Sequence, residues 1–175
     1  MVQPIAVLVT DGFEDSEYTE PVEALKAAGY SIVNIDIEKD KAVYGKKRQT
    51  PVRIDAAVRD VQPQDFTALL IPGGHAPDAL RGDAGVQEFV RAFDATGRPI
   101  FTICHGPHVL VSAEVVRGRK ITCVSNIAID LQNAGAEYVD ATVVIDGNRL
   151  VSSRTPKDLP QFIDAVLDVL ASIKK

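Results

Sequence analysis

Ile100-Phe101-Thr102-Ile103-Cys104-His105-Gly106-Pro107 is the stretch of this sequence that decides the fold. It begins with a short apolar run that has the length and β-branched character of a buried parallel strand. Gly106 then permits a sharp bend, and Pro107 suits the first turn of a helix, where its missing N–H needs no partner. A strand that turns sharply into a helix, with a reactive residue at the bend, is typical of a nucleophile elbow.

Cys104 occupies that bend. Its sulfur is expected at the top of the sheet, near a helix N-terminus whose dipole and free N–H groups stabilise a thiolate. We therefore predict a reactive cysteine. The alternative is a small buried apolar side chain, which is what most free cysteines are. The strand before Cys104 and the Gly-Pro pair after it favour the reactive interpretation.

The composition is that of an ordinary globular protein. A length of 175 residues suits one domain, spanning residues 1–175, with a full core. The net charge of −5 gives no general attraction to nucleic acid or anionic lipid, so neither is an expected partner. Two cysteines make no disulfide framework, and the sequence shows no secretory signal and no apolar run that could cross a membrane. We expect a cytoplasmic protein.

Strands and helices alternate along the chain. Strands are predicted at 5–10, 31–37, 69–71, 100–103 and 121–124, and helices at 16–28, 83–96, 108–114, 127–134 and from Pro156 onward. The polar segment 39–54 predicts a hairpin or irregular excursion, and Asp146-Gly147-Asn148 predicts a hairpin between 138–145 and 150–153. This pattern indicates an α/β fold with a mostly parallel central sheet and helices on both faces.

Three turns are expected to meet at one edge of that sheet. In parallel α/β sheets ligands bind beyond the carboxyl ends of the strands. This rule selects residues 10–17, 73–78 and 104–108, which are the turns richest in glycine, acids, histidine and cysteine. Their convergence is the main sequence evidence for an active site.

The first turn offers acids to pair with the cysteine. Glu17 would lie in the first helical turn and face back toward the strand ends, so we prefer it to Glu14 as the carboxyl beside Cys104. Glu14 and Asp15 are interpreted as acids that stabilise a helix N-terminus. Glu14 and His75 are also expected in a secondary part of the same pocket.

The other two turns offer hydrogen-bond donors and a base. Gly73 and Gly74 let the backbone approach a ligand closely, and with the N–H of His105 they would form an oxyanion hole. The His105 imidazole is a candidate general base or acid.

Other kinds of site are disfavoured. Cys104, His105 and His108 do not make a usual zinc site, which needs four ligands at fixed spacing. The sequence has neither a G-x-G-x-x-G after its first strand nor a G-x-x-x-x-G-K, so a dinucleotide site and a P-loop are not expected. Cys123, in a predicted strand, is interpreted as structural. We predict no metal and no cofactor.

Four segments resemble the PfpI intracellular-protease family. That family belongs to the superfamily of the Parkinson-disease protein deglycase and is more distantly similar to class I glutamine amidotransferase domains. The segments are Phe13-Glu14-Asp15-Ser16-Glu17, Ile71-Pro72-Gly73-Gly74-His75-Ala76-Pro77, Ile103-Cys104-His105-Gly106-Pro107, and Asp146-Gly147-Asn148 with Val151-Ser152-Ser153-Arg154. The resemblance implies a flavodoxin-like three-layer sandwich that assembles as a homodimer or a hexamer of dimers.

The resemblance also implies roles for individual residues. Cys104 would be the nucleophile and Glu17 the acid paired with its thiol. The backbone amides of Gly74 and His105 would surround the oxyanion. In the peptidase members, a Glu from a neighbouring subunit completes a triad with the His. The matching position here is Asp78, which is one methylene shorter.

Members of this family are described as peptidases, glyoxalases, deglycases and stress proteins. The first three activities share a thiolate that attacks a carbonyl carbon. We rank first a stress-response enzyme acting on small reactive carbonyls, which converts methylglyoxal to lactate without a cofactor. The alternatives are an intracellular cysteine peptidase acting on peptides, and a non-catalytic redox sensor in which Cys104 is oxidised to sulfinic acid beside Glu17.

Overall fold

A mostly parallel sheet forms the centre of the molecule. The computed structural model describes residues 2–173, and within that range seven strands form this sheet in the order β10-β11-β7-β6-β1-β2-β5. The bounds of these strands are β1 Ile5–Leu8, β2 Ile32–Asp36, β5 Ala56–Ala57, β6 Ala68–Ile71, β7 Ile100–Ile103, β10 Val143–Asp146 and β11 Leu150–Ser153. Only the β10–β11 pair is antiparallel, which confirms the predicted hairpin around Asp146-Gly147-Asn148. Its first strand begins at Val143 and not at Tyr138, which belongs to a separate two-stranded sheet.

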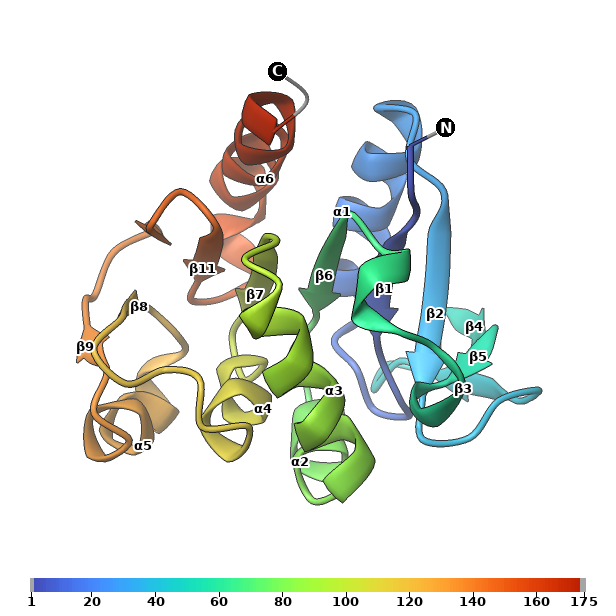
Figure 1. Cartoon of the computed structure of the whole chain (residues 1–175), viewed down its shortest axis with the longest axis horizontal. Coiled ribbons are helices and arrows are strands. Elements are labelled where there is room, and N and C mark those ends of the chain that lie inside the picture. The colour runs from blue at the N-terminus through green and yellow to red at the C-terminus, as the bar shows by residue number, and fades with distance from the viewer. Residues whose placement is uncertain (1, 174–175) are drawn as a thin grey trace.

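Helices cover both faces of the sheet, as predicted. Their bounds are α1 Asp15–Ala27, α2 Ala76–Arg81, α3 Ala84–Ala95, α4 Pro107–Ser112, α5 Ala128–Asn133 and α6 Leu159–Ile173. Helices α1 and α6 pack against each other on one face, and α2 to α5 lie on the other (Figure 1). Alternate residues of β1 supply the two cores, with Ile5 and Val7 facing α1 and α6 and Ala6 and Leu8 facing α2 to α5.

The strand order brings the three expected turns together. Strand β6 lies between β1 and β7, with Leu70 opposite both Val7 and Phe101. Because these strands are parallel, the segments after β1, β6 and β7 all begin at the same edge of the sheet. An isolated bridge between Phe13 and Gly74 joins the first two of them.

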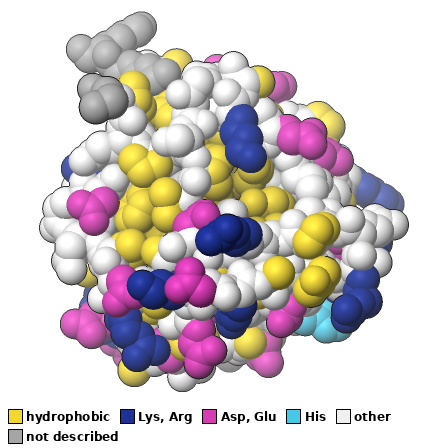
Figure 2. Space-filling view, turned by 90° about the vertical axis from the view of Figure 1, so that its right-hand side faces the viewer, with side chains coloured by type: hydrophobic (Ala, Val, Ile, Leu, Met, Phe, Trp, Pro, Cys, Tyr) yellow, Lys and Arg dark blue, Asp and Glu magenta, His cyan; other side chains and the backbone are white. Residues whose placement is uncertain are grey.

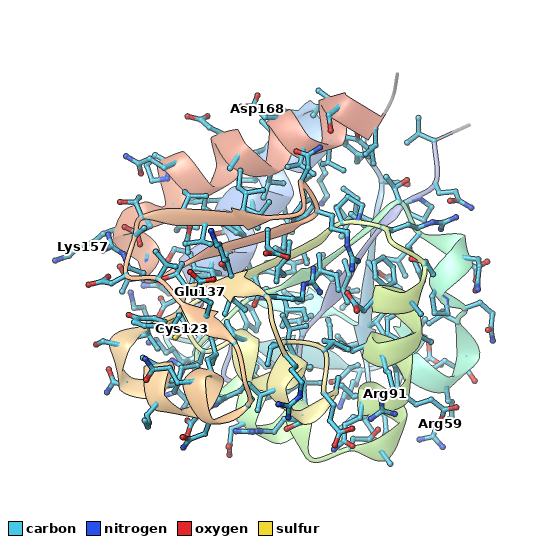
Figure 3. All side chains as sticks on the ribbon, turned by 60° about the vertical axis from the view of Figure 1, so that its left-hand side comes forward. Arg59, Arg91, Cys123, Glu137, Lys157 and Asp168 are labelled. Atoms are coloured by element: carbon cyan, nitrogen blue, oxygen red, sulfur yellow. The ribbon has the colours of Figure 1, made fainter. Side chains whose placement is uncertain are left out.

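The prediction of a strand over 121–124 is wrong. Strand β8 covers only Lys120–Ile121, and it pairs with β9 (Glu137–Tyr138) outside the central sheet. The amide of Thr122 donates to Ser152 Oγ and that of Val124 to the Cys104 carbonyl, so neither joins a strand ladder. Cys123 is fully buried between them, on the opposite side of the molecule from Arg59 and Arg91 (Figure 3).

Several short elements lie between the main strands and helices. Helix α2 starts inside the segment 73–78 that was expected to be a turn, with Pro77 in its first turn. The excursion at 39–54 forms the predicted hairpin, from β3 (Ala42–Tyr44) and β4 (Pro51–Arg53). Four 3₁₀ turns are found among the described residues: Val58–Asp60, Pro63–Asp65, Ser125–Ile127 and Pro156–Asp158.

One edge of the sheet is only partly covered. Strand β5 pairs with β2 at Ile35 and Asp36 alone, which leaves the first half of β2 without a strand neighbour on that side. Figure 2 faces this edge and shows apolar side chains gathered between charged ones. No helix in residues 2–173 has both the length and the apolar character needed to span a membrane.

Candidate active site

The backbone at Cys104 forms the predicted elbow. Its φ of 61° places a non-glycine residue in the left-handed region, which costs energy and recurs at functional sites. Hydrogen bonds hold this conformation: the Cys104 amide donates to the Ser153 carbonyl at 3.0 Å, and the Cys104 carbonyl accepts from Val124 at 3.1 Å. Gly106 must stay small, because a Cβ there would collide with Thr102 Oγ1 and the Ile71 carbonyl.

Glu17 lies beside the cysteine, on the other side of Gly73. Its side chain is fully buried, and Oε1 accepts the Gly73 N–H at 3.0 Å. A Cβ on Gly73 would lie 2.5 Å from Glu17 Oε1 and 2.8 Å from Cys104 Cβ. The structure therefore brings together Glu17, Gly73 and Cys104, which the sequence had placed on three separate turns.

Burial keeps the Glu17 carboxyl protonated at neutral pH. Loss of solvent, and next the negative charge of Glu14, raise its pKa from 4.5 to about 8. The Gly73 N–H, the charge of Lys46 and a hydrogen bond with Cys104 act in the opposite direction. The other oxygen, Oε2, is buried and receives no N–H from any described residue. It is the oxygen on which a proton is expected.

The thiol of Cys104 is also protonated in this resting state. Burial and the charge of an ionised Glu17 raise its pKa to about 12, whereas the backbone amides of His105 and Gly74 hydrogen-bond the sulfur and lower it. The amides act as the sequence predicts, but burial outweighs them. Because Glu17 and Cys104 share a hydrogen bond, their titrations are coupled, and the position of the proton between them decides whether the sulfur is a thiolate.

His105 provides the nearby base. Its Nδ1 lies 3.4 Å from Cys104 Sγ, so the two neighbouring side chains make the contact that their adjacency in sequence left open. Burial lowers the pKa of His105, and the charges of His108, Lys46 and His75 lower it further. The imidazole is consequently neutral at pH 7 and has one nitrogen free to accept a proton.

A pocket of about 350 Å³ opens beside the elbow, and all three histidines of the chain line it. Its lining is Gly74, His75, Asp78, His105 and His108. His108 Nε2 lies 3.0 Å from Asp130 Oδ2, and the side chains of His75 and Asp78 are exposed at the rim. Within the described residues, no group of three or more His, Cys, Asp or Glu side chains could hold a metal ion.

Glu14 and Asp15 hold a loop in place at the start of helix α1, where Asp15 is an acid of the first turn. Glu14 makes no side-chain cap, and its carboxylate lies 2.5 Å from Lys46 Nζ and 3.6 Å from Lys47 Nζ. The Asp15 carboxylate accepts the amides of Lys47 and Gln49. Lys46 is thus a residue near the site that sequence reasoning missed. Its only sequence signal is a basic run in a polar excursion, which is usually a solvated surface.

Comparisons with known proteins agree on one family. Residues 3–169 match the model of the DJ-1/PfpI family. Protein/nucleic acid deglycase 2 of Escherichia coli (strain K12) is 50% identical over 98% of this chain and 100% of its own length. Putative cysteine protease YraA of Bacillus subtilis (strain 168) is 52% identical over 97% of this chain and 99% of its own.

A solved structure with the same fold comes from Anabaena variabilis. It is a two-domain protein that contains DJ-1/ThiJ/PfpI-like and ferritin-like domains. The TM-score is 0.93 at 34% identity, over 97% of this chain and 48% of that one, so this chain spans about half of its length.

Proposed function

Because this chain belongs to the DJ-1/PfpI family, we propose that it is a cysteine-dependent enzyme acting on small reactive carbonyl compounds through Cys104. One observation carries the proposal. The elbow cysteine interacts with Glu17, a fully buried carboxyl whose pKa near 8 lets it give and take a proton at neutral pH. The name of the deglycase relative agrees with carbonyl chemistry, and methylglyoxal is the simplest substrate to test.

The proposed reaction begins with sulfur attack on the aldehyde carbon. His105 accepts the thiol proton over the 3.4 Å contact, and a C–S bond forms to give a hemithioacetal. The amides of Gly74 and His105, which already face the sulfur, stabilise the negative oxygen, and Glu17 then protonates it.

A proton transfer between neighbouring carbons follows. The Glu17 carboxylate removes the hydrogen from the carbon bonded to sulfur, and His105 protonates the adjacent ketone oxygen. Glu17 delivers this proton to the second carbon and takes up the hydroxyl proton of the carbon bonded to sulfur, which gives a thioester of lactate and restores the Glu17 acid. One water molecule hydrolyses the thioester, which releases lactate and restores the thiol. The overall reaction converts methylglyoxal and water to lactate, with no net oxidation.

Lactate production from methylglyoxal tests the proposal. The purified native protein is expected to form lactate and Cys104→Ser to form none above background. Cys123→Ser is the matched control, because Cys123 is buried and outside the pocket that holds His105, and it should keep native turnover. Equal rates in the native and Cys104→Ser proteins would show that the sulfur is not the nucleophile.

A cysteine peptidase is the second candidate. It is favoured by Asp78, which is exposed at the rim of the same pocket as His105. A triad would need Asp78 of a neighbouring subunit to reach His105. A relative is named a putative cysteine protease. In this case casein cleavage should require both Cys104 and Asp78, and cleavage that survives Asp78→Ala argues against it.

A redox-sensing stress protein is the third candidate. A protonated Glu17 would donate a hydrogen bond to an oxidised Cys104, which favours arrest at the sulfinic acid. Intact mass after mild peroxide should show two added oxygens on Cys104. Addition to Cys123 instead would count against this role.

A further inference from the structure

The loop after β3 is attached directly to the first turn of α1. The Lys46 amide donates to the Phe13 carbonyl at 2.8 Å, and the amides of Lys47 and Gln49 donate to the Asp15 carboxylate. Gly45 packs so closely on that carboxylate that no Cβ could be added. These contacts tie the backbone of the 45–49 loop to the chain at the start of α1.

The side chain of Lys46 is held as well. Its Nζ lies 2.5 Å from Glu14 Oε2, and the Glu14 side chain is only 7% exposed. Glu14 immediately precedes α1 and Glu17 lies in its first turn, close enough for the charge of Glu14 to raise the pKa of Glu17. The loop therefore places one cation against a buried anion, which itself lies beside the Cys104–Glu17 pair.

We propose that Lys46, anchored by Glu14, is a positioning residue that supplies the positive charge against which Cys104 and Glu17 lose their shared proton. This role rests on the function proposed for Cys104. Lys46 acts on the reacting atoms through its charge and does not need to contact the substrate.

The balance of charges explains why the site needs this cation. Loss of a proton from Cys104 or Glu17 creates a second negative charge near Glu14, in a region that excludes water. Three groups carry the charges in question: Lys46, Glu17 and Cys104. The other charged and titratable groups around them are Glu14, Lys47, His105 and, through His105, His75 and His108. Lys46 lowers the pKa values of both Glu17 and Cys104, whereas Glu14 raises that of Glu17.

The pH dependence of Cys104 alkylation tests this role. Iodoacetamide labelling rates are measured from pH 6 to 12 in a Cys123→Ser background, so that only one thiol reacts and the range reaches the raised pKa of Cys104. We expect Lys46→Met to move the midpoint upward by about one pH unit, a tenfold loss of thiolate at a given pH. Lys46→Arg should restore most of the shift, because the charge is kept.

Two further variants distinguish charge from structure. Lys47→Met is the matched control, because its side chain is 59% exposed and its Nζ lies 3.6 Å from Glu14; it should move the midpoint by less than a third as much. The double change Glu14→Gln with Lys46→Met removes both charges and should return the midpoint toward the native value. A merely structural role for Lys46 predicts that the double change is worse than the single one.

The proposal is overturned if Lys46→Met and Lys47→Met shift the midpoint equally, or if Lys46→Arg fails to restore it. Near-UV circular dichroism establishes that each variant compared is folded. Because alkylation is measured without a carbonyl substrate, these outcomes are independent of lactate production. A protein that makes no lactate but shows the Lys46 shift would refute the proposed reaction and leave this inference standing.

Discussion

Replacing the buried carboxyl by its amide, Glu17→Gln, should stabilise the fold at neutral pH. The folded carboxyl has a pKa near 8 and its unfolded counterpart one near 4.5. The contribution of the neutral Glu17 carboxyl to the free energy of unfolding is therefore fully present below pH 4.5. It is lost as the pH rises to 8, because only the unfolded chain ionises over that range. At about 1.36 kcal/mol per pH unit, burying Glu17 destabilises the protein by about 3 kcal/mol at pH 7. Glutamine stays neutral and can still accept the Gly73 N–H.

Urea unfolding at pH 5, 6, 7 and 8 measures this effect. The stability difference between Glu17→Gln and the native protein should grow by just over 1 kcal/mol for each pH unit. All samples need one protein concentration, since any self-association would also stabilise the fold. Glu20→Gln on the exposed side of α1 is the control and should differ from native by less than about 0.5 kcal/mol at every pH. A difference for Glu17→Gln that does not change with pH would refute the reasoning.

Three further outcomes are expected. Gly106→Ala should lower the free energy of unfolding by about 1 to 3 kcal/mol in the same urea assay, because a Cβ at this position has no room. Gly82→Ala is the control and should be neutral or slightly stabilising, because Gly82 has a negative φ and the nearest atom to an added Cβ is 3.8 Å away. Asp78→Ala should leave the alkylation midpoint of Cys104 unchanged, and a shift would place Asp78 in the resting site of one subunit. Asp130→Asn weakens the 3.0 Å contact between Asp130 and His108 Nε2, which is half exposed on its acid side, so the free energy of unfolding should change by less than about 1 kcal/mol in the same urea assay.

Elements defined by local sequence were predictable. The apolar run Ile100–Ile103 and the Gly106-Pro107 pair each have a strong conformational preference, and the structure has β7, the bend and α4 where these residues indicate. Helix α4 ends at Ser112, two residues before the predicted end at 114. The meeting of Glu17 with Cys104 followed from topology, since parallel strands bring their carboxyl ends to one edge of the sheet.

Elements defined by tertiary contacts were not predictable. The apolar segment Ile121–Val124 has the composition of a strand, but its amides bond to the Ser152 hydroxyl and the Cys104 carbonyl, which are distant in sequence. Lys46 was missed for the same reason. Its position depends on contacts between the 45–49 loop and the first turn of α1, and no periodicity or spacing rule relates the two segments.

The state of the nucleophile shows where a local rule fails. A helix N-terminus lowers the pKa of a thiol, and the amides of His105 and Gly74 do act in that direction on Cys104. The same packing that positions these amides also removes water from the sulfur and places Glu17 beside it, and the combined effect is larger and of opposite sign. A resting thiol is therefore consistent with a reactive site, provided that a base and a cation accompany it. His105 at 3.4 Å and Lys46 across Glu14 supply those two groups, so reactivity here belongs to the cluster and not to the elbow alone.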